Sequence, residues 1–348
     1  MQSKILSFGE LLLRVSPAMI DHNDKHPFLL YIGGAEANTA TALAGWDVPV
    51  DYLTVLPDNF MSQHVLRYLG SKRINTSSVL MAGNRIGVYY LDRGADLKSS
   101  VIYDRVLSSF SGLKPNVIDW DKALHNVSWL NLTAISPALN QDVAEVCIEA
   151  LKAASEKNIT TSLDLNYRSR LWKYGKDPKE VMPLLLEYCD VVMGNIWSAN
   201  SLLGTSLDEN IHDKGNRSDY LAHAESTSLE IIKRFPRCSS VANTFRFDDT
   251  QKLLYYTSLH TGGKQYNSKE FHATKVIDRS GSGDCFMAGL IYGFYNNHCP
   301  QEIVNFATAA AFGKLQESGD STEQDIFIVK ETDINPIETG RASRFSDS

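Results

Sequence analysis

The chain has 348 residues, of which 43% are hydrophobic and 22% are charged. These proportions are ordinary for a soluble globular protein and supply enough apolar residues for a large core. The formal net charge is −7 at pH 7 and the sequence has no stripe of Lys and Arg, which argues against a nucleic-acid partner. No apolar stretch approaches the ~20 residues that a membrane span needs. We therefore expect small-molecule partners, and neither nucleic acid nor membrane.

The cysteines indicate a reducing compartment. There are five of them, and none forms a CxxC pair: Cys147, Cys189, Cys238, Cys285 and Cys299. An odd number argues against a complete disulfide framework. The N-terminal segment carries Lys4, Glu10 and Arg14 among its apolar residues, so it does not form a secretory signal. The sequence predicts a cytoplasmic protein.

The first third of the chain predicts short strands and two helices. Apolar or β-rich runs indicate strands at 4–8, 11–17, 28–32, 50–56, 86–91 and 99–106. An Ala-rich helix is expected directly after Gly33-Gly34, and a second helix over 62–70. The two β-rich stretches near 10–32 and 86–106 predict a small separate sheet.

From about residue 127 the chain alternates strand and helix. We expect strands at 127–132, 160–165, 190–193 and 239–244, and helices at 140–157, 178–188, 197–203 and 228–235. Such alternation is typical of parallel strands joined by crossover helices. The polar stretch 204–228 is interpreted as an insertion, and the polar segment from 331 as a frayed tail.

The segment 276–294, VIDRSGSGDCFMAGLIYGF, carries the chemistry. A strand-like start passes through Gly281-Ser282-Gly283 into a helix with apolar residues at helical spacing. The unpaired N–H groups at such a helix start favour an anion, typically a phosphate. Asp284, just inside the helix, is placed to accept a proton from an attacking hydroxyl. By itself the segment is more often a turn and helix cap, since Asp is common in the first turn of a helix for that reason alone. It is not a Walker A loop, and the chain has no GxGxxG after its first strand, which argues against a dehydrogenase.

A second motif makes the first one specific. Gly33-Gly34-Ala35-Glu36-Ala37-Asn38 opens the early helix, and Asp278 to Asp284 form a late DxxGxGD. Together they resemble the ribokinase-like (PfkB-type) carbohydrate kinases, from about residue 3 to 330. The resemblance implies an α/β fold with a mostly parallel central sheet flanked by helices and a small β-sheet lid. It implies an α/β kinase domain at 1–9, 33–84 and 109–330, a β lid at 10–32 and 85–108, and a tail at 331–348.

The resemblance also implies the catalytic parts. Asp284 would be the base and the backbone at Gly281, Ser282 and Gly283 the anion hole, with ATP and Mg²⁺ as cofactors. Arg279 and Ser282 replace the family's Thr and Ala without removing the base or the flanking glycines. Ser198 stands where the family's Asn-x-x-Glu segment has Glu, so the Mg²⁺ ligands are left unassigned.

Several segments narrow the resemblance to 2-keto-3-deoxygluconate kinases. They are the opening FGELLLRVSP, Tyr103-Asp104-Arg105, and the DLNYR…LW segment from Asp164 to Trp172. The function implied is phosphorylation of 2-keto-3-deoxygluconate to its 6-phosphate. Arg would suit the carboxylate of a sugar acid, and Tyr would offer a ring face and a hydroxyl. The residues expected to bind the sugar acid are Gly33, Gly34, Asn38, Tyr89, Tyr103, Arg105, Arg168 and Asp320.

The sequence gives weaker indications of the residues that bind the nucleotide. The residues expected near ATP are Asn195, Thr244, Arg246, Gly281, Gly283 and Gly313, although small residues such as Gly313 equally suit helix packing.

Two alternative functions stay open: a fructokinase or other neutral-sugar kinase, and a non-catalytic sugar- or nucleotide-binding regulator. A homodimer through the outer face of the lid is also expected. The stereochemistry of the sugar and any activation by monovalent cations stay open.

Overall fold

The structure is a computed structural model that describes residues 3–18, 27–93, 99–248 and 253–334. Its centre is one large sheet of strand order β14-β13-β12-β11-β10-β9-β1-β4, with β15 paired to β13. The six parallel strands are β1 (Lys4–Phe8), β4 (Val50–Leu53), β9 (Val127–Thr133), β10 (Thr160–Asp164), β11 (Val191–Gly194) and β12 (Ser240–Asp248). The antiparallel strands are β13 (Leu253–Thr261), β14 (Lys264–Asn267) and β15 (Phe271–Ala273). The expected mostly parallel sheet is confirmed.

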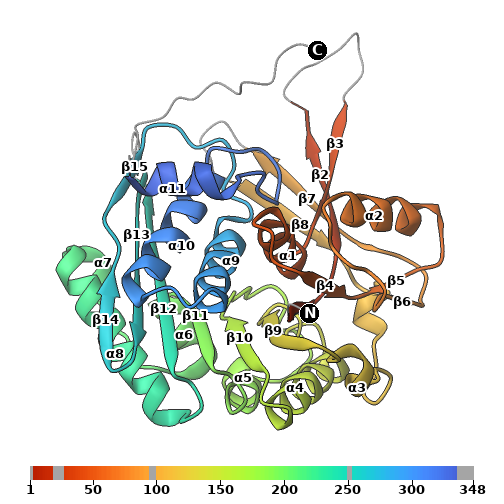
Figure 1. The fold of residues 1–348 in the computed structure, drawn as a ribbon, viewed down its shortest axis with the longest axis horizontal. Helices are drawn as coiled ribbons and strands as arrows, with labels where there is room; N and C mark the ends of the chain where they lie inside the picture. The colour runs from red at the N-terminus through yellow and green to blue at the C-terminus, as the bar shows by residue number, and fades with distance from the viewer. Residues whose placement is uncertain (1–2, 19–26, 94–98, 249–252, 335–348) are drawn as a thin grey trace.

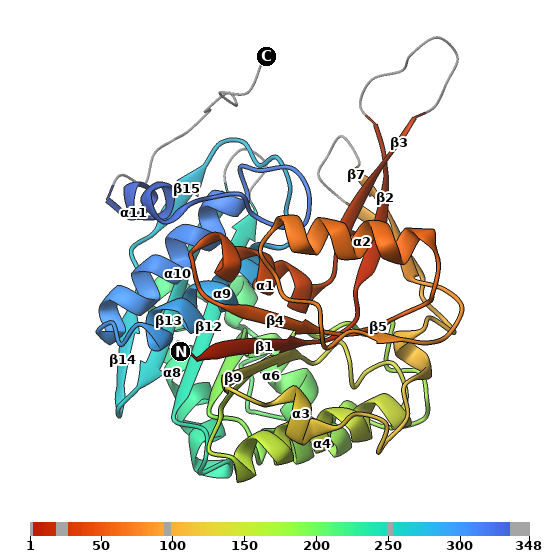
Figure 2. The same ribbon diagram turned by 45° about the vertical axis from the view of Figure 1, so that its right-hand side comes forward.

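Helices cover both faces of this sheet (Figures 1 and 2). Neighbouring residues of β1 show the consequence, because Ile5 packs into one core and Leu6 into the other. One face carries α1 (Ala35–Gly45), α2 (Phe60–Ser71), α9 (Ser282–Tyr295), α10 (Pro300–Lys314) and α11 (Ile326–Ile334). The other carries α3 (Trp120–Ala123), α4 (Gln141–Glu156), α5 (Pro178–Leu186), α6 (Ile196–Leu203) and α8 (Arg217–Arg234).

A small four-stranded sheet stands apart from the large one (Figure 2). Its strand order is β3-β2-β7-β8, with β2 and β7 parallel and the other pairs antiparallel. The strands are β2 (Leu12–Pro17), β3 (Phe28–Gly33), β7 (Gly87–Arg93) and β8 (Ser99–Asp104). The two β-rich stretches of the sequence therefore do pair with each other. The remaining elements are β5 (Val55–Leu56), β6 (Leu80–Met81), the 3₁₀ turn Phe110–Gly112 and α7 (Ile211–Lys214).

Three sequence predictions need correction. The strand expected at 50–56 is two strands, since β4 belongs to the large sheet whereas β5 pairs with β6. The helix expected at 228–235 begins at Arg217, because the Asn216 side chain accepts the N–H groups of Ser218 and Asp219. The polar stretch 204–228 thus contains α7 and much of α8. The expected tail from 331 begins inside α11, and its part at 335–348 lies outside the described residues.

None of the helices in the described ranges combines the length and the apolar character that crossing a membrane requires.

Candidate active site

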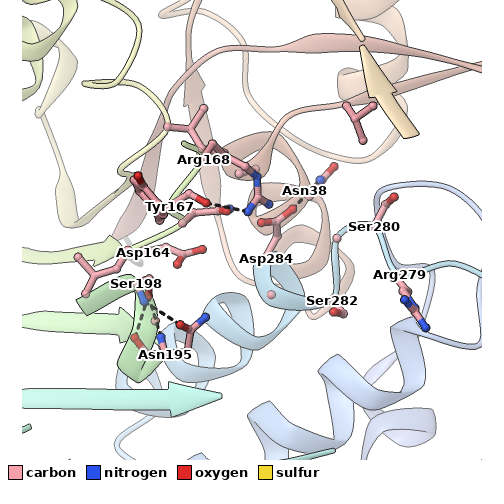
Figure 3. A pocket seen from close by; sticks show the side chains of 18 of the residues that line it. Asn38, Asp164, Tyr167, Arg168, Asn195, Ser198, Arg279, Ser280, Ser282 and Asp284 are labelled. Atoms are coloured by element: carbon pink, nitrogen blue, oxygen red, sulfur yellow. Dashed lines mark hydrogen bonds between the residues drawn. The ribbon is translucent and has the colours of Figure 1, made fainter. Parts of the chain in front are cut away.

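A cavity of about 800 Å³ lies at the carboxyl ends of the parallel strands, between the large sheet and the small one. This is the edge where open α/β sheets bind their ligands. Most of the predicted site residues line it: Gly34, Asn38, Tyr89, Tyr103, Arg105, Arg168, Asn195, Thr244, Arg246, Gly281, Ser282, Gly283, Asp284 and Asp320. Segments separated by almost the whole chain therefore meet at one place, as Figure 3 shows for ten labelled residues.

The backbone at 281–284 forms an N–H cradle on the cavity wall. Gly281 is the N-cap of α9 in the left-handed region, with φ of 77°, and no side chain caps this helix. The N–H groups of the first turn have no partner within their own helix. A Cβ at Gly281 would overlap the carbonyl oxygen of Asp320, so only glycine fits. Free N–H groups arranged in this way can bind an anion such as a phosphate.

Asp284 lies in the first turn of α9 and faces the same cavity. Asn38 of α1 donates a hydrogen bond from Nδ2 to Asp284 Oδ2 at 2.7 Å. Burial raises the pKa of Asp284 to about 6, against the opposing effects of Asn38 and of the nearby Arg168. A carboxylate with this pKa is ionised at neutral pH and still basic enough to take a proton during a reaction.

The small sheet contributes side chains that expose polar groups to the cavity. Tyr89 on β7 donates its hydroxyl hydrogen to Asp320 Oδ1, and its ring lies 6.4 Å from that of Tyr103 on β8. Gly33 does not line the cavity but packs beside Asp320, where an added Cβ would lie 3.0 Å from Cγ. Gly33 therefore packs against a residue that lines the cavity, Asp320, without lining the cavity itself.

Arg105 is held more firmly than the sequence suggested. Its Nη2 donates to Glu10 Oε2, and Ser108 donates to the other oxygen of the same carboxylate. Arg105 is 4% exposed and Glu10 is 3% exposed. Sequence reasoning left Glu10 out of the site, because nothing local shows that a residue 95 positions away would pair with it. One guanidinium nitrogen is thus paired with Glu10, and Arg105 also lines the cavity.

Arg168 is an exposed cation that lines the cavity. It follows β10, and Figure 3 shows its guanidinium pointing toward Asp284. Its Nη1 donates to the carbonyl oxygen of Tyr167 at 3.2 Å. Two positions later, Arg170 donates to the carbonyl oxygen of Val101 at 2.8 Å and so joins this loop to the small sheet. The loop places a solvent-accessible cation where an anionic substrate group can reach it.

The other end of the cavity is lined by Asn195, Ser198, Thr244 and Arg246. Asn195 and Ser198 form a reciprocal capping box at the start of α6. The serine in place of the family's glutamate therefore has a structural role. Thr244 donates from Oγ1 to the carbonyl oxygen of Gly194 at 3.3 Å. This end combines polar side chains and a cation, which together can bind an anionic group.

Gly313 was expected near the nucleotide, and it is not among the described residues that line the cavity. It lies on α10 against Gln324, whose side-chain oxygen would overlap any Cβ at this position. The packing explanation that the sequence left open accounts for this glycine.

Two buried carboxyl groups near Asp284 were not predicted as site residues. Glu36 accepts hydrogen bonds from the N–H and Oγ1 of Thr133, at 3.0 and 2.8 Å, and burial raises its pKa to about 7. Asp164 ends β10 and lines the cavity, and burial raises its pKa well above the usual value. Both lie inside segments quoted for the resemblance, which was the available signal.

The residues that line the cavity could supply only a few of the ligands of a magnesium ion. Among the described residues, no three His, Cys, Asp or Glu side chains cluster as a metal cage. Magnesium commonly keeps several waters and uses one or two carboxylates together with substrate phosphates. The carboxylate of Asp164 fits that pattern, and the amide of Asn195 adds a polar neighbour.

Comparison with known proteins agrees with this geometry. The model of the pfkB family of carbohydrate kinases matches residues 2–326. A 2-dehydro-3-deoxygalactonokinase of Haloferax volcanii is 29% identical over 322 residues, 92% of this chain and 93% of that protein. A 5-dehydro-2-deoxygluconokinase of Clostridium tetani is 22% identical over 313 residues, 88% of this chain and 85% of that one. The crystal structure of 2-dehydro-3-deoxygluconokinase from Thermotoga maritima has 31% identity and a TM-score of 0.87, covering 96% of this chain and 100% of that one. The chain belongs to the pfkB family of carbohydrate kinases.

Proposed function

We propose that this carbohydrate kinase transfers the γ-phosphoryl group of ATP to a hydroxyl of a sugar acid, converting 2-keto-3-deoxygluconate to its 6-phosphate. One observation carries the proposal. The buried carboxylate of Asp284, the uncapped N-terminus of α9 and the exposed guanidinium of Arg168 converge on one cavity. A base, an anion hole and a cation for the substrate's carboxylate are the parts that this reaction needs.

The proposed mechanism uses these groups in one in-line displacement. The sugar hydroxyl attacks the γ-phosphorus while Asp284 takes its proton, and the bond to the β-phosphate oxygen breaks with ADP leaving. Backbone N–H groups at 281–284 stabilise the negative charge on the oxygens of the transferred phosphoryl group. Mg²⁺ held near Asp164 would neutralise charge on the phosphates when bound. The small sheet acts as a lid that excludes water, the competing acceptor.

The charge of the cavity supports an acidic sugar rather than a neutral one. Arg105 and Arg168 both line the sugar end, where Tyr89 and Tyr103 supply ring faces and hydroxyls. Arg105 already neutralises Glu10, so Arg168 is the cation that we assign to the substrate's carboxylate. Gly34 also lines the cavity, and only glycine fits there, because its φ of 120° and the adjacent carbonyl oxygen of Glu10 leave no room for a side chain.

Replacing Arg168 with alanine is expected to raise KM for 2-keto-3-deoxygluconate by about 10- to 100-fold, because one charge-assisted contact is lost. The KM for fructose or ribose, which carry no carboxylate, should change less than about threefold. The measurement is ADP release in a coupled assay, with wild type and variant tested on all three sugars and on the galacto isomer. Equal changes for acidic and neutral sugars would remove the carboxylate assignment, and preferred turnover of fructose by the wild type would favour a neutral-sugar kinase.

We also propose that the lid's outer face joins two copies of the chain. Cross-strand register aligns Leu30, Val15, Tyr90 and Ile102 in one apolar row. Leu30, Tyr90 and Ile102 are 49%, 41% and 64% exposed. Contiguous exposed apolar residues of this kind mark interaction surfaces.

Replacing Ile102 with glutamate should turn a dimer into a monomer in sedimentation velocity, because the new charge would be buried at the interface. Leu229, which is 51% exposed on α8, offers the matched control Leu229→Glu. A wild-type chain that sediments as a monomer at tens of micromolar would refute the dimer.

A further inference from the structure

Arg14 is a buried cation that the mechanism above does not use. It lies on β2, between β3 and β7 in the small sheet, and has 0% exposure. A buried charge is costly unless it is paired. The carboxylates that pair with Arg14 belong to the catalytic side of the molecule rather than to the small sheet.

The guanidinium contacts both segments that border the N–H cradle. Its Nη1 donates to Asp278 Oδ2 and to Ser280 Oγ, each at 3.0 Å. Its Nε lies 3.3 Å from Asp320 Oδ2. Asp278 and Ser280 precede the cradle directly, and Asp320 forms the turn against which Gly281 packs. One side chain of the small sheet therefore reaches both sides of the proposed anion hole.

Asp278, which pairs with Arg14, also accepts hydrogen bonds from the backbone. Its carboxylate accepts the N–H of Ser280 at 3.0 Å and the N–H of Gly319 at 3.0 Å. The first bond is internal to the 278–284 loop, and the second joins this loop to the turn that carries Asp320. Arg14 is the cation in direct contact with both Asp278 and Asp320. Without it, the more distant buried Lys314 would be left to balance the two carboxylates, and their mutual repulsion would loosen the loop from the turn.

Arg14 is also part of a row that crosses the whole small sheet. Register places Arg14 opposite Tyr31 on β3 and Tyr89 on β7, and Tyr89 opposite Tyr103 on β8. The guanidinium lies 4.0 Å from the ring centre of Tyr31. Tyr89 and Tyr103 line the cavity. The side chains proposed to face the sugar and the side chain that contacts Asp278 and Asp320 thus belong to the same sheet.

We propose that Arg14 is a positioning residue that couples the lid to the anion hole, so that the cradle is shaped for phosphoryl transfer only while the lid is seated. This rests on the proposed function of the site. The planar guanidinium suits the task, since it contacts two carboxylates and a hydroxyl in fixed directions, which a lysine ammonium does not. The expected defect of a variant is therefore in turnover rather than in substrate affinity.

The first test compares Arg14→Lys and Arg14→Met with wild type in steady-state kinetics, using the sugar that the wild type phosphorylates best. We expect kcat to fall about 100-fold or more in both variants, with KM for ATP and sugar changed less than about fivefold. The matched control is Arg237→Lys. Arg237 pairs with Asp190 at 3.1 Å, is not among the residues lining the cavity, and its replacement should leave kcat unchanged. An Arg14→Lys variant within about threefold of the wild-type kcat would overturn the proposal.

The second test does not depend on activity. Hydrogen exchange of the ligand-free variants, read by mass spectrometry, should be at least about 10-fold faster than wild type in peptides covering 278–284 and 319–321. Exchange in the peptide covering β9, 127–133, should be unchanged. Unchanged exchange at 278–284 would overturn the coupling, and faster exchange across the whole chain would show a general role in stability instead. If no sugar were phosphorylated by the wild type, the proposed function would fail while this measurement still decided the role of Arg14.

Discussion

Replacing Asp284 with asparagine is expected to lower kcat by about 10³- to 10⁴-fold, the upper part of the range for removing a positioned general base. Asparagine has the same shape and can still accept the hydrogen bond that Asn38 donates at 2.7 Å. It cannot take a proton from the sugar hydroxyl. KM for ATP and for the sugar should therefore stay within about threefold of wild type, since the contacts that bind both substrates are retained and only stabilisation of the transition state is lost.

The pH profile separates loss of the base from a general disturbance. The pKa of Asp284 is raised to about 6, and the carboxylate must be ionised to act as base, so wild-type kcat/KM should rise with pH through about 6 and level off above 7. Asp284→Asn should lose this acid limb. Asp119→Asn is the matched control, because Asp119 caps α3 through the N–H of Lys122 at 3.0 Å and asparagine caps equally well. Near wild-type turnover in Asp284→Asn would refute the assignment of the base.

The parts of the site that local patterns encode were predictable. The glycines and the helical spacing of the apolar residues after Gly281-Ser282-Gly283 identify a helix start with free N–H groups. The strand expected directly before them, at Val276-Ile277, is wrong, since the last strand before α9 ends at Ala273. Strand-helix alternation implies that strands ending at Asp164 and Gly194 deliver their following loops to one edge of the sheet. The capping box of Asn216 and Asp219 was equally local, and it would have placed the start of α8 correctly.

The pairings between distant charges were not predictable from spacing. Arg105 pairs with Glu10, which lies 95 positions away in the sequence, and Arg14 pairs with Asp278, which lies 264 positions away. Each arginine taken alone is more often a surface charge than a buried one. Their partners are set by how the small sheet is placed over the large one, which no segment of the sequence specifies by itself.

Replacing Gly281 with alanine is expected to lower kcat by about 100- to 1,000-fold, comparable to the loss of one donor from an oxyanion hole. The added Cβ would overlap the carbonyl oxygen of Asp320, and the residue has a φ of 77°. An alanine in this left-handed region costs about 1–3 kcal/mol. The turn must therefore shift away from Asp320, which displaces the N–H groups that we propose bind the transferring phosphoryl group. Steady-state kinetics together with a thermal melt would measure both effects.

Gly263→Ala distinguishes displacement of the cradle from backbone strain alone. Gly263 has a φ of 76°, almost the same as Gly281, but no heavy atom lies within 4 Å of the position of an added Cβ. Both variants should lose stability from the unfavourable φ. Only Gly281→Ala should lose turnover, because only there does the side chain push against the wall of the site. Equal kcat in the two alanine variants would mean that the N–H groups at 281–284 do not hold the transferring phosphate, and the anion hole would have to be sought elsewhere along the cavity.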